Sequence, residues 1–266
     1  MEFKNKVVLI VGASSGIGRV LALRLAGEGA VVTVTARRQE RLDALVDEMA
    51  QRGDLGLALA ADAQDPDAAE QVVKEVVRRF GRIDLVVLNA GGAPALDMRT
   101  MGAREVTACM RSNYDVAVNV LFPVLHQMVR QGHGLVAVTN SLAGWLGVPL
   151  QGPYSAAKGA LRLLIDTCRI EFGPLGVRFV SIYPGFVATE ATANDGMPAP
   201  LALSEAQAVE HIVHALRREP LDYLFPFTMR WLVRLALLLP KRWTTHILRR
   251  ELPALPAHAA GSPPTT

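Results

Sequence analysis

Hydrophobic runs bounded by turn residues alternate along the chain with amphipathic stretches of helical period. The runs that predict strands lie at residues 6–11, 30–35, 55–60, 83–88, 135–139 and 177–183, with a further short apolar stretch around Leu224. The stretches that predict helices lie at residues 16–28, 38–51, 66–80, 153–172 and 204–218. Such alternation is typical of βαβ units. The pattern therefore predicts an α/β fold with a doubly wound, mostly parallel sheet and helices on both of its faces.

Two segments interrupt this alternation. Two helices are expected in the middle of the chain, at about residues 101–112 and 113–130, but the pattern does not fix the boundary between them. Residues 191–203 are rich in Ala, Pro, Asn and Gly, a composition that predicts a mobile loop.

The chain of 266 residues is half hydrophobic and one fifth charged, as expected of a globular protein. No interdomain linker is visible, so we expect one domain over residues 1–226. An apolar and basic extension follows at 227–252, and the Pro and Ala of residues 253–266 predict a flexible tail.

The charge and the cysteine content limit which binding partners and which cellular compartment the sequence predicts. The net charge is only +3 and aromatic residues are sparse, which argues against a nucleic-acid partner. Cys109 and Cys168 lie far apart, so they predict neither a disulfide framework nor a zinc site. The first residues lack the long apolar core of a signal peptide, and a reducing cytoplasm is therefore the expected compartment.

A glycine-rich turn joins the first predicted strand to the first helix. It contains Gly12, Ser14, Ser15, Gly16, Ile17 and Gly18. A diphosphate needs close backbone approach, free N–H groups and the positive end of a helix, and small residues at such a turn allow all three. The alternative is a glycine-rich turn that binds nothing, but its position between strand and helix favours a dinucleotide site.

The end of the second predicted strand bears on the choice between the two nicotinamide cofactors. A carboxylate there would accept hydrogen bonds from the adenosine ribose, whereas this chain has Arg37 and Arg38. Arginine forks suit the oxygens of a 2′-phosphate, which favours NADP(H). The alternative is a pair of solvated surface arginines.

Tyr154 and Lys158 lie four residues apart in a predicted helix, so their side chains leave the same face. An ammonium near a phenol lowers the pKa of the phenol and makes proton exchange with a substrate oxygen easier. Alone, this spacing arises readily by chance. Ser141 strengthens the interpretation because it follows a predicted strand end, the edge where parallel sheets bind ligands.

These motifs together resemble the short-chain dehydrogenase/reductase family. The resemblance rests on Gly12-x-x-x-Gly16-x-Gly18, Asn89-Ala90-Gly91, Ser141 and Tyr154-x-x-x-Lys158, which have the order and spacing of that family. It implies a single-domain Rossmann fold with a seven-stranded sheet. It also implies hydride transfer between NADP(H) and a small-molecule ketone, aldehyde or secondary alcohol, and a homo-oligomer, either dimer or tetramer.

The family also implies residue roles. Tyr154 would be the catalytic acid/base, Lys158 would lower its pKa and bind the nicotinamide ribose, and Ser141 would orient the carbonyl. Asn113 looks like the family's fourth catalytic residue. Further cofactor contacts are implied for Asp62, Asn89, Ala90, Gly91, Pro184, Gly185, Val187 and Thr189.

The extension at 227–252 has an apolar run too short to cross a bilayer, which takes about 20 residues. It contains Arg230 and Arg234 on one face and Trp231 and Leu235 on another. A lid over the substrate cleft, a subunit interface, a peripheral membrane contact and plain intrachain packing all remain open. By resemblance, apolar C-termini of this kind suggest a bulky, lipid-like or steroid-like substrate.

Two other functions fit these residues less well. A non-catalytic NADP(H)-binding sensor would leave the four catalytic-type residues without a reason to occur together. An epimerase or dehydratase of related fold would have a larger C-terminal substrate domain. His211 and His214 lie three residues apart, but no third ligand is evident and no metal site is expected.

Overall fold

The computed structural model describes residues 1–190, 192–193 and 202–252. The predicted tail at 253–266 and most of the predicted loop at 191–203 lie outside the described residues.

Seven strands form one central sheet, as expected, and every strand pairing in it is parallel. The strand order is β3-β2-β1-β4-β5-β6-β9. The strands are β1 (Val7–Val11), β2 (Val31–Ala36), β3 (Gly56–Ala60), β4 (Leu85–Leu88), β5 (Gly134–Thr139), β6 (Val177–Pro184) and β9 (Asp222–Phe225). The apolar stretch around Leu224 is thus the edge strand β9. Two short strands, β7 (Val187–Ala188) and β8 (Leu203–Ser204), pair separately.

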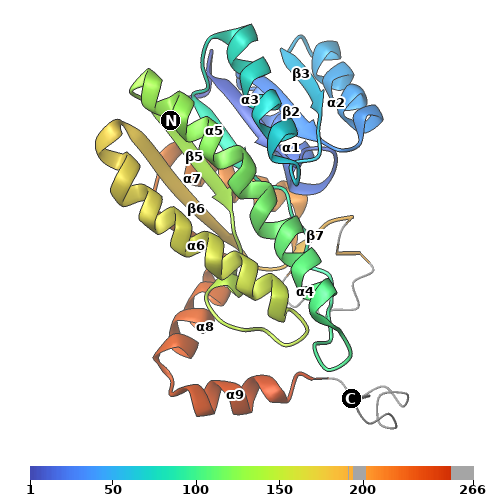
Figure 1. The fold of residues 1–266 in the computed structure, drawn as a ribbon, viewed down its shortest axis with the longest axis vertical. Coiled ribbons are helices and arrows are strands. Elements are labelled where there is room, and N and C mark those ends of the chain that lie inside the picture. The colour runs from blue at the N-terminus through green and yellow to red at the C-terminus, as the bar shows by residue number, and fades with distance from the viewer. Residues whose placement is uncertain (191, 194–201, 253–266) are drawn as a thin grey trace.

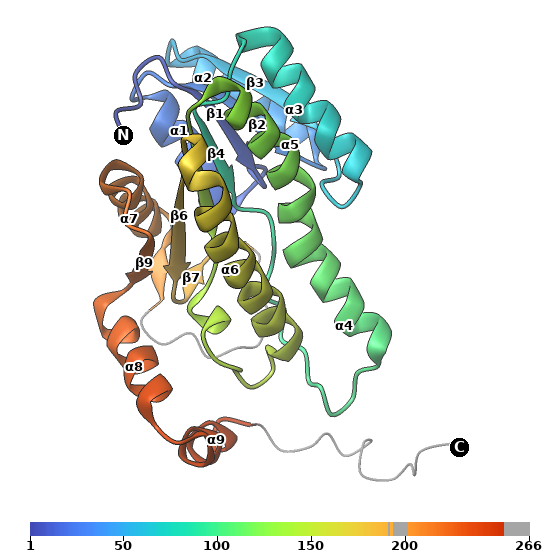
Figure 2. The same cartoon turned by 60° about the vertical axis from the view of Figure 1, so that its left-hand side comes forward.

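Helices cover both faces of the sheet and complete the three layers of a Rossmann fold (Figures 1 and 2). One face carries α1 (Gly16–Ala26), α2 (Gln39–Gln51) and α7 (Glu205–Arg218). The other carries α3 (Pro66–Phe80), α5 (Val116–Gln131) and α6 (Gly152–Phe172). Short 3₁₀ turns span Leu142–Gly144 and Gly173–Leu175.

The protein has one hydrophobic core on each face of the sheet, and the alternation of side chains along β1 shows why. Val8 and Ile10 face the core beneath α1, α2 and α7, whereas Leu9 and Val11 face the core beneath α3, α5 and α6. Because successive side chains of a strand point to opposite faces, an entirely apolar strand must be covered on both. The predicted fold class is therefore confirmed.

The middle of the chain differs from the two separate helices expected. α4 (Ala103–Met110) continues through a π-helical turn at Arg111–Asp115 into α5 without a break. A π turn keeps the backbone hydrogen-bonded while adding one residue to the helix, so hydrophobic periodicity gives little sign of it.

Beyond β9, α8 (Phe227–Leu238) and α9 (Lys241–Arg249) extend past the end of the sheet (Figures 1 and 2). Pro240 separates them, as expected for a residue that lacks a backbone N–H and ends helices. Among the described residues, no helix has the length and apolar character needed to span a membrane.

Candidate active site

A cavity of about 880 Å³ lies at the carboxyl ends of the central strands. The strand order reverses between β1 and β4, and open α/β sheets bind ligands at such a reversal. All of the site residues predicted from sequence line this cavity except Gly18 and Asn113, which lie behind its wall.

The glycine turn packs tightly against the end of β4. Gly12 has φ +83°, and a Cβ there would lie 2.6 Å from the Cα of Ala90. A Cβ on Gly18 would lie 2.2 Å from the carbonyl oxygen of Gly12 and 2.8 Å from Nδ2 of Asn89. Asn89 Nδ2 itself donates to the Gly12 carbonyl at 3.1 Å. Gly18 therefore shapes the turn from behind.

The start of α1 has the character of an anion site. Ser15 precedes the helix without a side-chain cap, and the first turn carries no acidic residue. Gly16 has φ +61°, a left-handed conformation that side chains rarely adopt. Uncapped N–H groups and the positive end of the helix dipole face the cavity, so the residues fit a diphosphate.

Arg38 links the glycine turn to the end of β2. Its guanidinium donates to Ser14 Oγ at 2.8 Å and to Ser15 Oγ at 2.8 Å. Arg37 is exposed at the cavity rim, and no described residue forms a hydrogen bond with its side chain. Both arginines thus line the cavity at the end of β2, next to the glycine turn.

Glu190 is a charged neighbour of Arg38 that was not predicted from sequence. Its carboxylate accepts a hydrogen bond from Arg41 at 2.5 Å and lies 3.5 Å from Arg38 Nη1. The hydrogen bond from Arg41 lowers the pKa of Glu190, so the group is ionised at neutral pH. A carboxylate thus occupies the arginine cluster in the chain alone.

Ser141, Tyr154 and Lys158 converge on the cavity as expected. The Ser141 side chain lies close enough to the Tyr154 hydroxyl to affect its pKa, and Lys158 Nζ lies 5.7 Å from the centre of the Tyr154 ring. Nζ donates to the carbonyl oxygen of Thr139 at 2.9 Å, which fixes the ammonium at the end of β5. The α6 helix places Tyr154 and Lys158 one turn apart on the same face.

The pKa of Tyr154 differs in direction from the expectation. Burial raises it above the ordinary tyrosine value, against the opposing effect of the hydrogen bond with Ser141. Burial also lowers the pKa of Lys158 to about 8. Both shifts have one cause, because an apolar pocket disfavours the charged form of each group. Tyr154 is therefore a protonated phenol in the chain alone.

Asn113 lies in the π turn and supports the cavity floor from behind. Its Oδ1 accepts from the backbone N–H of Gly92 at 2.9 Å, and its Nδ2 donates to the Cys109 carbonyl at 3.1 Å. A Cβ on Gly91 would lie 2.6 Å from Asn113 Oδ1 and 3.6 Å from Lys158 Nζ. The glycine is thus needed for Asn113 and Lys158 to approach the same strand end.

The remaining predicted contacts surround the cavity on two sides. Asp62 follows β3, and its Oδ1 accepts from Gln64 N at 3.0 Å. Pro184 ends β6, and the N–H of Gly185 donates to Phe225 O at 2.8 Å. Val187 and Thr189 also line the cavity beyond β6.

The far end of the cavity is apolar, and it includes side chains of α8 and α9 that were not predicted to line it. Leu142, Leu146 and Val148 line it from the segment after β5. Met229 and Val233 of α8 and Leu248 of α9 complete this wall. The amphipathic pattern of the extension was the available signal, but it did not show which face turns inward.

The two histidines of α7 lie outside this site. His211 stacks on Phe225 with ring centres 4.6 Å apart, and its Nδ1 lies 3.2 Å from the Tyr223 hydroxyl. Within the described part of the chain, no three potential ligands converge as a metal site requires.

Sequence comparison places this site in a known context. The family profile described as short chain dehydrogenase matches residues 6–198. An uncharacterised oxidoreductase of Myxococcus xanthus is 34% identical over 239 residues, covering 90% of this chain and 94% of its own length. A 3-oxoacyl-(acyl-carrier-protein) reductase, FabG, of Staphylococcus epidermidis is 33% identical over 189 residues, covering 71% of this chain and 78% of its own.

Solved structures agree with the sequence matches. An alcohol dehydrogenase from the archaeon Thermococcus sibiricus, complexed with 5-hydroxy-NADP, superposes with a TM-score of 0.75 at 30% identity. The match covers 84% of this chain and 96% of that one. A short-chain dehydrogenase from Streptomyces avermitilis gives a TM-score of 0.77 at 26% identity, covering 93% and 97%.

Proposed function

The chain belongs to the short-chain dehydrogenase/reductase family and is an oxidoreductase of that family, and from that premise we propose that it uses NADP(H) to interconvert a carbonyl compound and an alcohol. The observation that carries the proposal is the convergence of Ser141, Tyr154 and Lys158 on the cavity that begins at the glycine turn.

The proposed cofactor contacts follow from the donors that line the cavity. The uncapped N–H groups of α1 would hold the diphosphate, and Arg37 and Arg38 would hold the 2′-phosphate. Asp62 would contact the adenine. The NADP derivative named for the Thermococcus sibiricus enzyme supports this choice of cofactor.

The proposed reaction assigns a task to each polar side chain. Bound NADPH supplies the hydride. Ser141 and Tyr154 hold the carbonyl oxygen, and Tyr154 donates its proton as negative charge develops there. A raised pKa keeps this proton on Tyr154 before reaction. Lys158 binds the nicotinamide ribose and stabilises the phenolate that remains, while Asn113 holds the cavity floor in place through the Gly92 N–H.

The apolar wall of Leu142, Leu146, Val148, Met229 and Val233 supports a bulky apolar ketone or alcohol as substrate. We further propose that residues 1–226 form the catalytic domain, to which α8 and α9 add part of the substrate wall, that the enzyme works in the cytoplasm, and that it forms a homo-oligomer.

A panel of ketones and aldehydes of increasing apolar bulk, scored by NADPH consumption, tests the reaction and the substrate class together. Fluorescence titration with NADPH and NADH tests the cofactor. We expect turnover of bulky ketones and tighter binding of NADPH. Equal affinities for NADPH and NADH would contradict the proposed role of Arg37 and Arg38. Absence of turnover across the panel would overturn the proposed reaction.

A further inference from the structure

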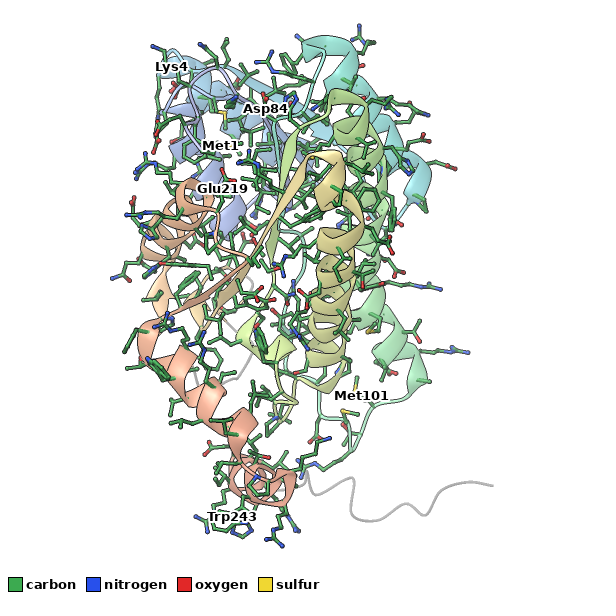
Figure 3. All side chains as sticks on the ribbon, turned by 90° about the vertical axis from the view of Figure 1, so that its left-hand side faces the viewer. Met1, Lys4, Asp84, Met101, Glu219 and Trp243 are labelled. Atoms are coloured by element: carbon green, nitrogen blue, oxygen red, sulfur yellow. The ribbon has the colours of Figure 1, made fainter. Side chains whose placement is uncertain are left out.

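Helices α8 and α9 carry a set of exposed apolar side chains, here called the α8–α9 face. Its members are Phe227, Trp231, Leu235, Leu238, Trp243 and Ile247. Leu238 is 82% exposed and Trp243 is 56% exposed. In Figure 3, Trp243 lies at the outer end of the molecule, far from Met1 and Lys4. Single exposed apolar residues are common on soluble proteins, but a contiguous set marks an interaction surface.

Helical spacing brings the α8 members of this set together on one side of the helix. Phe227, Trp231 and Leu235 are each one turn apart along α8, and the rings of Phe227 and Trp231 lie 6.1 Å apart. On the inward side of the same helix, Met229 and Val233 pack against the protein and line the cavity. The helix is thus apolar on both sides, and only one side is covered.

Positive charge surrounds the α8–α9 face. The segment 227–252 carries six cations, Arg230, Arg234, Lys241, Arg242, Arg249 and Arg250, against the single carboxylate of Glu251. None of the six forms an ion pair with a carboxylate of the described residues. The guanidinium of Arg234 instead lies over the Trp231 ring at 5.5 Å. Elsewhere, arginines such as Arg24 and Arg78 are paired.

We propose that the α8–α9 face docks on the surface of a lipid bilayer that contains anionic phospholipid. Apolar side chains flanked by cations, with tryptophan near the polar headgroups, are typical of helices that lie in the membrane interface. The helices have 12 and 9 residues, too short to span. Each cation near an anionic surface adds to the binding.

A second copy of the chain fits this face poorly. A two-fold interface places the same patch of both subunits together, which would bring two sets of unpaired cations into one contact. Like charges at close range oppose association, whereas anionic headgroups neutralise them. Charge complementarity therefore favours the bilayer.

Docking through this face sets the orientation of the cavity. Because Met229, Val233 and Leu248 line the cavity from the inner side of the same helices, the apolar end of the cleft lies beside the membrane surface. The docking itself does not depend on the proposed reaction, since it is measured without cofactor or substrate.

Vesicle flotation of the full-length protein tests the inference. The probes are vesicles of phosphatidylcholine alone and of phosphatidylcholine mixed with phosphatidylglycerol. We expect flotation with the mixed vesicles, weaker binding as salt is added, and little binding to the neutral ones. The double variants Leu235→Gln/Leu238→Gln and Arg242→Gln/Arg249→Gln should each bind mixed vesicles roughly tenfold more weakly.

A matched control removes apolar area elsewhere. Leu55 and Leu175 are also exposed and lie at the amino ends of β3 and β6, so Leu55→Gln/Leu175→Gln should float like the wild type. Circular dichroism melting checks that every variant is folded. The inference is overturned if the wild type fails to float with mixed vesicles or floats equally with neutral ones. It is also overturned if the Leu235/Leu238 variant lowers the mass in light scattering while flotation persists, because a second copy would then cover the face.

Discussion

Glu190 and Arg41 form an ion pair of 2.5 Å that brings the segment after β7 onto the start of α2, beside Arg38. The pair matters for the proposed cofactor because a carboxylate lies where a 2′-phosphate would bind. Phosphate and carboxylate compete for the same guanidinium donors.

Replacing Glu190 with glutamine should therefore tighten NADPH binding. The pair is exposed and such pairs are weak, so we expect the dissociation constant for NADPH to fall roughly two- to fivefold, with little change for NADH. Fluorescence titration measures both. Glu40→Gln is the control, since it removes one negative charge from α2 at a side chain that contacts neither arginine. If the dissociation constant for NADPH falls equally in both variants, the cause is the loss of negative charge in general and not competition for the guanidinium donors.

Tyr154→Phe should retain NADPH binding and lose turnover by roughly 100- to 10,000-fold, the usual contribution of a positioned proton donor. The phenylalanine keeps the ring against Lys158 while removing the hydroxyl that Ser141 contacts. Single-turnover assays with saturating NADPH measure the change. Undiminished turnover would exclude Tyr154 as the acid.

The buried Lys158 should make stability depend on pH. Because burial lowers the pKa of Lys158 to about 8 from 10.5, the unfolded chain binds more protons than the folded chain between these values. The free energy of unfolding contributed by Lys158 therefore rises with pH across this window, and the cost of burying the ammonium is fully present below it.

Comparison with Lys158→Met isolates this effect. The free energy of unfolding of the wild type should increase relative to the variant by roughly 1 to 3 kcal/mol as pH rises through the window. Urea denaturation at pH values from below 8 up to 10.5 measures the difference. A constant difference would show that the lysine titrates normally in the folded chain.

Alanine substitutions at the adjacent glycines Gly91 and Gly92 should have very different effects on turnover and stability. A Cβ on Gly91 would meet Asn113 Oδ1 at 2.6 Å, whereas a Cβ on Gly92 would meet nothing within 4 Å. We expect Gly91→Ala to shift Asn113 and Lys158, to lose roughly 100-fold in turnover and to destabilise the fold by roughly 1–3 kcal/mol. Gly92→Ala should stay near the wild type in turnover assays and thermal melts. Similar losses in both would contradict the packing argument.

The sequence predicted those features that local patterns encode. β1, the glycine turn and α1 were evident because an apolar run meets glycines of fixed spacing, and Tyr154 and Lys158 because helical spacing brings them to one face. Glu190 was not predictable in this way, since its partner Arg41 is 149 positions distant in the chain. The direction of the Tyr154 pKa was missed for a related reason, because burial depends on the whole pocket rather than on Lys158 alone.

The π turn at Arg111–Asp115 has a consequence for how this part of the chain tolerates changes in length. A single extra residue in a helix rotates everything on one side of it by about 100° relative to the other. Removing one residue here would restore a regular helix. It would also rotate either Asn113 or the whole of α4 about the helix axis, away from its present packing position. A one-residue deletion in this turn would thus break the support that Asn113 gives behind the cavity floor.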